Sequence, residues 1–222
     1  MNTIYKYILF DLDGTLTDSA EGVTRSVSYA LSKYGIKTNP ADLKTFIGPP
    51  LQLSFRQVYG FSEEKAREAV EYYRDYYREK GIFENRLYPG IKDMLKRLSE
   101  KDIKLFVATS KPTLFAKKIL DYYEVGRYFE LIIGSNLDGT RVDKTEVIQA
   151  VFEKAEIPDK NLAVMVGDRE HDLIGAQKHN LDSIAVSYGY GTLEELKAAN
   201  PTAIAHSVEE LSSMLLKKFL VS

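Results

Sequence analysis

The feature that most constrains this chain is a short apolar run, residues 7–10, that ends in two carboxylates two positions apart. The run has the length of a strand buried on both faces, and on an extended backbone Asp11 and Asp13 can face the same side. Two carboxylates about 4 Å apart repel each other by roughly 4 kcal/mol at an effective dielectric of 20. A divalent cation removes that repulsion, and oxygen ligands suit magnesium. With the metal bound, one carboxylate can act as a nucleophile and the other as a proton donor.

The same four residues, Asp11 to Gly14, match two other structures. An EF-hand calcium loop also opens with D-x-D, but it needs Asp or Asn at its fifth position and Gly at its sixth. Those positions hold Thr15 and Leu16, which excludes an EF-hand. An ordinary turn at a strand end, with Asp and Gly supplying the turn chemistry, stays open on these residues alone.

The composition is that of a globular protein, with 44% hydrophobic and 28% charged residues. The net charge of −2 gives no sign of a nucleic-acid or anionic membrane surface, and no apolar run approaches the length of a membrane span. We therefore expect neither a nucleic acid polymer nor a membrane as partner. The absence of cysteine excludes disulfides, thiolate metal sites and cysteine nucleophiles. Because the first residues lack a signal-peptide pattern, a cytoplasmic location is the default expectation.

Apolar runs alternate with helical segments over most of the chain. Strands are expected at 7–10, 104–109, 131–133, 162–166, 183–187 and, more weakly, 203–205. Helices are expected at 91–99, 112–123, 144–155, 169–179 and 208–219. This alternation predicts an α/β fold, a Rossmann-like, doubly wound parallel sheet covered by helices on both faces.

A helical stretch interrupts this alternation after the first strand. Its helical segments begin near residues 19, 39 and 62 and stop at Gly35, Gly48 and Gly81. An excursion of this length within an α/β unit is usually functional, such as a lid. We therefore predict an inserted helical cap domain at 17–87, with the catalytic core formed by 1–16 and 88–222.

Polar residues follow the predicted strands at the ends where open α/β sheets bind ligands. Besides the two carboxylates after the first strand, these residues are Thr109, Ser110 and Lys111, Asp168 and Asp172, and Lys144, which opens the helix before the strand at 162–166. Together they supply carboxylates for a metal, hydroxyl donors and lysine cations. That inventory suits phosphoryl transfer, where positioning and charge neutralisation do most of the catalysis.

The order of these motifs resembles the haloacid dehalogenase (HAD) superfamily, within its phosphatase branch. The matching elements are D-x-D-G-T at 11–15, T-S at 109–110, Lys144 and G-D-x-x-x-D at 167–172, with a helical insertion after the first. The resemblance covers essentially the whole chain. It implies a Mg²⁺-dependent phosphatase in which Asp11 attacks phosphorus to form an aspartyl-phosphate. Asp13 would protonate the leaving alcohol, activate water and bind the metal through its carbonyl.

The resemblance also assigns the other motif residues. Thr109 would donate to the phosphoryl oxygens, with Ser110 beside it, and Lys144 would pair with the nucleophile and the phosphate. Asp168 would bind the metal and Asp172 would support it. Lys111 either approaches the phosphate or simply lies in the loop before a helix.

Within the branch, bacterial 5′-nucleotidases and phosphoglycolate phosphatases look most similar, on residues 134–144 and 167–172. The implied substrate is a small phosphorylated metabolite or a nucleoside monophosphate. Dehalogenation is disfavoured because Asp13 has no role in it, but a phosphosugar mutase of the same superfamily stays an alternative. So does a regulatory protein that has lost the chemistry.

Three further features have simpler interpretations. The second Asp-Gly-Thr, at 138–140, is expected to be a turn. His171 is expected to be a partly exposed residue at a helix start, with a role near the metal as the alternative. Phe46 or Phe55 could stack on a nucleotide base, although a place in the cap core is the simpler expectation for either. The sequence gives no indication of the oligomeric state.

Overall fold

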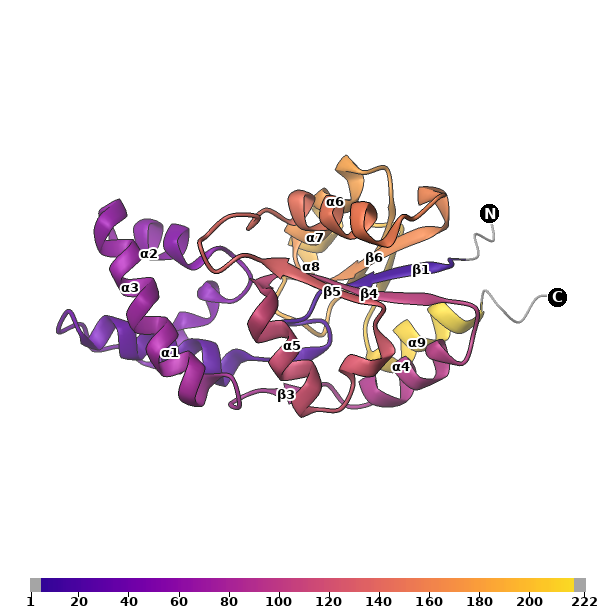
Figure 1. The fold of residues 1–222 in the computed structure, drawn as a ribbon. Coiled ribbons are helices and arrows are strands. Elements are labelled where there is room, and N and C mark those ends of the chain that lie inside the picture. Colours follow the sequence, from indigo (N-terminus) through magenta and orange to yellow (C-terminus); the bar gives the residue numbers. More distant parts are fainter. Residues whose placement is uncertain (1–4, 218–222) are drawn as a thin grey trace. The chain divides into compact units, whose positions relative to one another are not determined.

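The computed structural model describes residues 5–217, which divide into two compact units. One unit contains the chain up to Thr17 together with the chain from Leu87 onward, and the other is Asp18–Arg86. Figure 1 shows the first as a sheet with helices and the second as mainly helical. The role of the second unit as a cap stays a prediction.

The first unit is built on a parallel sheet that, within residues 5–217, has six strands in the order β5-β4-β1-β6-β7-β8. The strands are β1 (Tyr7–Phe10), β4 (Lys104–Pro112), β5 (Leu131–Ser135), β6 (Ala163–Gly167), β7 (Asp182–Val186) and β8 (Ala203–Ala205). Every neighbouring pair is parallel. The predicted doubly wound α/β fold is therefore confirmed.

Helices cover both faces of this sheet (Figure 1). They are α4 (Ile91–Ser99), α5 (Thr113–Tyr122), α6 (Lys144–Ala155), α7 (Glu170–Lys178), α8 (Leu193–Ala198) and α9 (Val208–Lys217). Helices α6 and α7 lie on one face, and α4, α5 and α9 lie on the other. The end of the last predicted helix, residues 218–219, lies outside the described residues.

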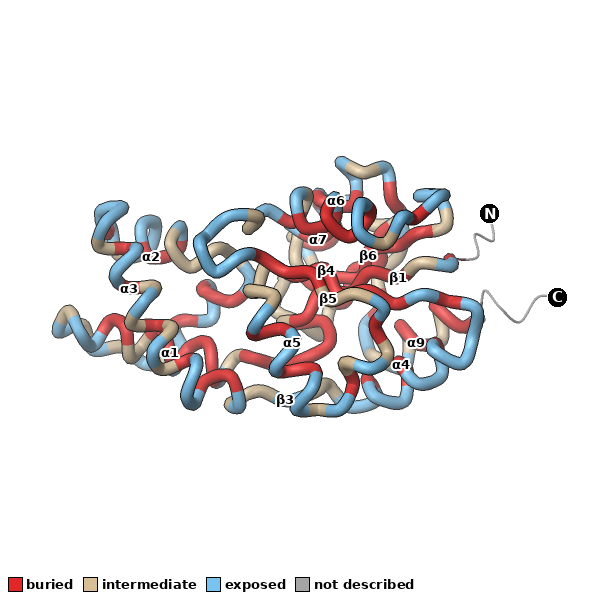
Figure 2. The backbone as a smooth tube through the Cα atoms, in the orientation of Figure 1, coloured by how far each residue is buried: buried red, intermediate tan, exposed pale blue. Residues whose placement is uncertain are grey.

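Strand β1 is central because its apolar residues are buried on both sides. Ile8, Leu9 and Phe10 are fully buried, and Phe10 is in register with Val107 of β4 and Val166 of β6. Figure 2 shows the same burial along β1, β4 and β6. The strand order runs from β1 to β4 on one side and to β6 on the other. This makes the carboxyl end of β1 the switch point where such sheets bind ligands.

Strand β4 is longer than predicted. It continues to Pro112, and its register with β5 shifts between Ala108 and Pro112. Thr109, Ser110 and Lys111 therefore lie on an irregular strand end rather than in a loop. The shift had no sequence signal, because a bulge depends on how the neighbouring strand pairs.

Among the described residues, the second unit contains three α-helices, a 3-10 helix (η1) and a π-helix (η2). They are α1 (Ala20–Ser32), η1 (Pro40–Phe46), α2 (Leu51–Tyr59), α3 (Glu63–Tyr76) and η2 (Tyr77–Gly81). The short strands β2 (Thr17–Asp18) and β3 (Arg86–Leu87) pair where the chain enters and leaves. Helix α2 was not predicted, and the segment after Asn39 is a 3-10 helix rather than an α-helix.

Aromatic residues form the core of this second unit. Phe46 and Phe55 are buried, with their ring centroids 5.1 Å apart, and Phe55 stacks on Phe61 at 5.9 Å. Neither phenylalanine is available to stack on a base, so the simpler expectation for both was right. No helix in the stretch from residue 5 to residue 217 is both long and apolar enough to span a bilayer.

Candidate active site

Asp11, directly after β1, lies against the ammonium of Lys144. The Asp11 amide still donates to the Val166 carbonyl at 2.9 Å, so the sheet fixes the backbone at this position. Lys144 Nζ donates to Asp11 Oδ1 and to the Ala108 carbonyl, each at 2.8 Å. Lys144 is only 5% exposed. The sheet therefore holds a buried carboxylate–ammonium pair at its switch point.

Lys144 reaches this place because it is the first residue of α6. Asp143 caps the helix by accepting a hydrogen bond from Thr145 N at 2.7 Å. The cap fixes where the first turn begins and thus where the lysine side chain starts.

Two further carboxylates come from β6 and α7. Asp168 follows β6 directly and is fully buried, and its oxygens accept hydrogen bonds from Thr15 Oγ1 at 3.2 Å and Tyr190 N at 2.8 Å. Asp172 lies in the first turn of α7, where Oδ2 accepts from Arg169 N at 3.1 Å. Its Oδ1 is 2.7 Å from Lys144 Nζ, an ion pair whose angles are not those of a hydrogen bond.

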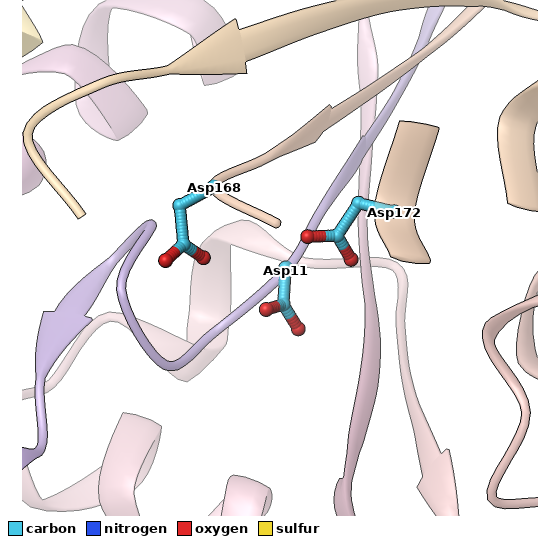
Figure 3. Close-up of side chains that lie close together, drawn as sticks. All are labelled: Asp11, Asp168 and Asp172. Carbon is cyan, nitrogen blue, oxygen red and sulfur yellow. The ribbon is translucent and has the colours of Figure 1, made fainter. Parts of the chain in front are cut away.

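Asp11, Asp168 and Asp172 form a buried trio, and one oxygen of each lies within 4.8 Å of the others. Figure 3 shows the three side chains converging from β1, from the end of β6 and from α7. Burial, and then the charges of Asp11 and Asp172, raise the pKa of Asp168 well above its usual range. Burial also raises the pKa of Asp172 to about 6, although Lys144 opposes the shift.

The trio fits a divalent cation. Burial lowers the pKa of Lys144, but Asp11 and Asp172 outweigh it and raise that pKa overall, so the ammonium stays charged. A bound cation would favour the ionised form of all three carboxylates, and in that form the trio with its one ammonium leaves two negative charges uncompensated. Carboxylate oxygens are hard ligands that suit Mg²⁺, whose charge equals that excess. The donor set and the charge of the site therefore agree with the predicted magnesium ion.

The Asp13 carboxylate pairs with Lys111 and not with Lys144. Lys111 Nζ is 2.7 Å from Asp13 Oδ1 and 2.5 Å from Oδ2, and both side chains are largely buried. Of the two expectations for Lys111, a free position in a loop is wrong, because the residue lies on β4 and pairs with Asp13. The binding of metal by the Asp13 carbonyl and of phosphate by Lys111 stay predictions.

The two hydroxyl residues of β4 differ in what they contact. Thr109 is 1% exposed, and its Oγ1 accepts from Lys111 N at 3.3 Å. Ser110 Oγ donates to the Val142 carbonyl at 3.2 Å, which ties β4 to the loop before Lys144. Their predicted contacts with a phosphate stay predictions.

Two of the simpler interpretations are confirmed. In the second Asp-Gly-Thr, Asp138 Oδ1 accepts from Thr140 N at 2.9 Å and from its hydroxyl at 2.7 Å, which is the bonding of a turn. His171 is exposed near the start of α7. The segment after β7, which supplies Tyr190 N to Asp168, was missed, because a backbone amide has no signature in the sequence.

A comparison with protein families shows to which family the chain belongs. A family model described as haloacid dehalogenase-like hydrolase matches residues 8–186, from β1 to the end of β7. The chain belongs to this family. The resemblance found in the motifs is thereby confirmed.

Relatives match over nearly the whole length of this HAD-family chain. A 5′-nucleotidase of Pseudomonas aeruginosa is 45% identical over 95% of this chain and 96% of its own length. A crystal structure described as a predicted phosphatase from Clostridium acetobutylicum has 50% identity and a TM-score of 0.93, covering 96% of this chain and 99% of that one.

Other relatives carry different names. The tyrosine-protein kinase PtkA of Mycobacterium tuberculosis is 38% identical over 94% of this chain and 72% of its own length. A phosphoglycolate phosphatase of Vibrio parahaemolyticus is 28% identical over 93% of this chain and 94% of its own length. Similarity over nearly the whole chain is therefore found to proteins with three different names, a 5′-nucleotidase, a tyrosine-protein kinase and a phosphoglycolate phosphatase.

Proposed function

We propose that this HAD-family hydrolase is a magnesium-dependent phosphatase of small phosphomonoesters that works through an aspartyl-phosphate at Asp11. The observation that carries the proposal is the buried Asp11–Lys144 pair at the switch point of the sheet, with Asp168 and Asp172 beside it. A carboxylate held on a rigid strand end next to a fixed cation is suited to attack a phosphoryl group whose charge it would otherwise repel.

In the first proposed step, an Asp11 oxygen forms a bond to phosphorus while the bond from phosphorus to the leaving oxygen breaks. Asp13 gives its proton to that oxygen. Asp13 then takes a proton from water, the water oxygen bonds to phosphorus as the bond from phosphorus to the Asp11 oxygen breaks, and inorganic phosphate leaves with Asp11 regenerated. Lys144 stabilises the charge near Asp11 throughout. A magnesium ion held by Asp11, Asp168 and Asp172 would supply further neutralisation of charge on the phosphoryl group.

A nucleoside 5′-monophosphate is the substrate class we place first. The P. aeruginosa relative named as a 5′-nucleotidase is 45% identical over nearly its full length, whereas the V. parahaemolyticus phosphoglycolate phosphatase is 28% identical. Phosphoglycolate is the second candidate, since it presents the same phosphate to the same core residues.

The test is release of inorganic phosphate from a nucleoside monophosphate, phosphoglycolate and a sugar phosphate, with magnesium and with excess chelator. We expect release with magnesium, loss of release in chelator, and the highest kcat/KM for the nucleotide. Asp11→Asn should abolish release, because an amide cannot attack phosphorus. Asp102→Asn is the matched control, since the Asp102 side chain is 98% exposed.

Each other outcome points to a different function. Transfer of the phosphoryl group to another hydroxyl of a sugar phosphate, with no phosphate released, would indicate the mutase alternative. A parallel assay with a nucleoside triphosphate and a tyrosine peptide tests for a kinase, and transfer of the phosphoryl group to the peptide would indicate that function. Release that persists in Asp11→Asn would contradict the proposal outright.

A further inference from the structure

The segment after β7, residues 188–191, packs directly on Asp168. Tyr190 N donates to Asp168 Oδ2 at 2.8 Å. A Cβ added to Gly189 would lie 2.4 Å from the Gly14 carbonyl oxygen, and one added to Gly191 would lie 2.1 Å from the Asp168 carbonyl oxygen. Both positions therefore need glycine, because backbone lies against backbone there.

The same segment also contacts the loop after β1. The Tyr188 hydroxyl donates to the Thr15 carbonyl at 3.0 Å, and Thr15 Oγ1 in turn donates to Asp168 Oδ1 at 3.2 Å. Each oxygen of Asp168 thus accepts a hydrogen bond from a different part of the chain. These contacts fix the orientation of the Asp168 carboxylate.

Glu195, on α8, holds the first turn of α7 in a similar way. Its Oε1 accepts from Arg169 Nε at 2.8 Å and from Glu170 N at 3.0 Å. Arg169 occupies the N-cap position of α7, but an arginine side chain has no acceptor with which to cap a helix. Glu195 supplies that acceptor from a neighbouring helix, and its negative charge is favourable at a helix N-terminus.

Arg169 and Glu170 connect the two carboxylates that come from this part of the chain. Asp168 directly precedes Arg169, and Asp172 Oδ2 accepts from the Arg169 amide at 3.1 Å. A shift of Arg169 therefore moves Asp168 and Asp172 together. Arg169 and Glu195 are both about four-fifths buried, so solvent screens their ion pair only in part.

We propose that Glu195 is a positioning residue for the metal site: by holding Arg169 and Glu170, it keeps Asp168 and Asp172 at the spacing that binds the ion. The inference rests on the proposed function, since it takes magnesium as that ion. Removing a group that orients metal ligands typically weakens metal binding by about 10–100-fold. Glu195→Ala should therefore raise the dissociation constant for Mg²⁺ about tenfold or more, while kcat at saturating magnesium changes much less.

The experiment measures magnesium binding to the purified full chain by calorimetry, without substrate, and kcat at saturating magnesium. Glu195→Gln should bind more weakly than the parent but better than Glu195→Ala, because its amide oxygen can still accept from Glu170 N. Glu194→Ala is the matched control, since Glu194 is exposed on the same turn of α8 and should bind as the parent does. Far-UV circular dichroism establishes that each variant is folded.

Two failures can be told apart. If the parent chain bound no magnesium, the metal requirement of the proposed function would be wrong, and this inference with it. If the parent bound magnesium and Glu195→Ala bound it equally well, only the role of Glu195 would be wrong. Should Glu195→Ala not fold, Glu195→Gln decides, and an unchanged dissociation constant in that variant overturns the inference.

Discussion

At the scale of single residues, Lys144 is the group on which the candidate site most depends. Its ammonium lies 2.8 Å from Asp11 and 2.7 Å from Asp172, so it pairs with two of the three carboxylates of the buried trio. Its position could be predicted only from the family resemblance, because a lysine that opens a helix is usually exposed. The pairing of Lys111 with Asp13 could not be predicted, because the family resemblance assigned no such contact.

Lys144→Ala should lower kcat by about 10²-fold or more, because the charge that develops beside Asp11 loses its fixed cation. The metal-free protein should also lose about 3 kcal/mol or more of its free energy of unfolding, since two buried carboxylates lose their partner. Steady-state kinetics and chemical denaturation measure these changes. Lys118→Ala, at an exposed position of α5, should change neither, and equal behaviour of the two variants would contradict the role of Lys144.

At the scale of elements, the strands were predictable and some of the connections were not. The runs at 7–10 and 162–166 are apolar throughout because these strands are buried on both faces. Helix α2 was missed because it is short, follows Pro50 and buries only Ser54 and Phe55. The segment at 188–191 was missed because its contacts with Asp168 are made by a backbone amide and by glycines.

The N-terminus of α6 carries a prediction about pH. Hydrogen bonds from Thr145 lower the pKa of Asp143 below its ordinary value of 3.8, although burial opposes them. A lowered pKa means that the cap contributes stability above the unfolded pKa and loses it as pH falls through the folded pKa. Asp143→Ala should therefore cost about 1 kcal/mol of unfolding free energy at neutral pH. The difference from the parent should shrink in acid below pH 3.8.

Chemical denaturation of Asp143→Ala and of the parent, at neutral pH and in acid, measures this difference in unfolding free energy. Asp143→Ala should also lower kcat several-fold, because the cap sets the place of Lys144. Asp159→Ala is the control, since Asp159 caps the 3-10 helix η4 (Lys160–Leu162) in the same way, accepting from Asn161 N at 3.0 Å, but at the amino end of β6 rather than at the carboxyl end that carries Asp168. That variant should leave kcat unchanged, and an equal loss of kcat in both would show that the cap of α6 has no special role.

At the scale of the whole molecule, the doubly wound core could be predicted because alternating strands and helices have few other arrangements. The candidate catalytic residues all lie in the core unit, so recognition of the leaving group is expected from the inserted unit, Asp18–Arg86. Which of its residues face a substrate could not be read from the pattern of apolar positions. That pattern indicates only which residues are buried within the unit. Phe46 and Phe55, for example, are buried in its core.

A substitution of Arg56, an exposed cation on α2, tests whether the inserted unit recognises the leaving group. Arg56→Gln should change kcat/KM by different factors for a nucleoside monophosphate, phosphoglycolate and a sugar phosphate. Arg67→Gln, at an exposed position of α3, should leave the ratios unchanged. Uniform changes across the three substrates would mean that Arg56 has no part in specificity.

The central claim is that the phosphoryl group passes through Asp11, and trapping the intermediate tests it most directly. The protein is mixed with magnesium and a nucleoside monophosphate, quenched in acid within a turnover, digested, and analysed by mass spectrometry. We predict one added phosphoryl group on the peptide that contains residues 7–15, located on Asp11 by fragmentation and absent from Asp11→Asn. Phosphate release with the phosphoryl group on another residue, or with none trapped under conditions that preserve acyl phosphates, would contradict the account.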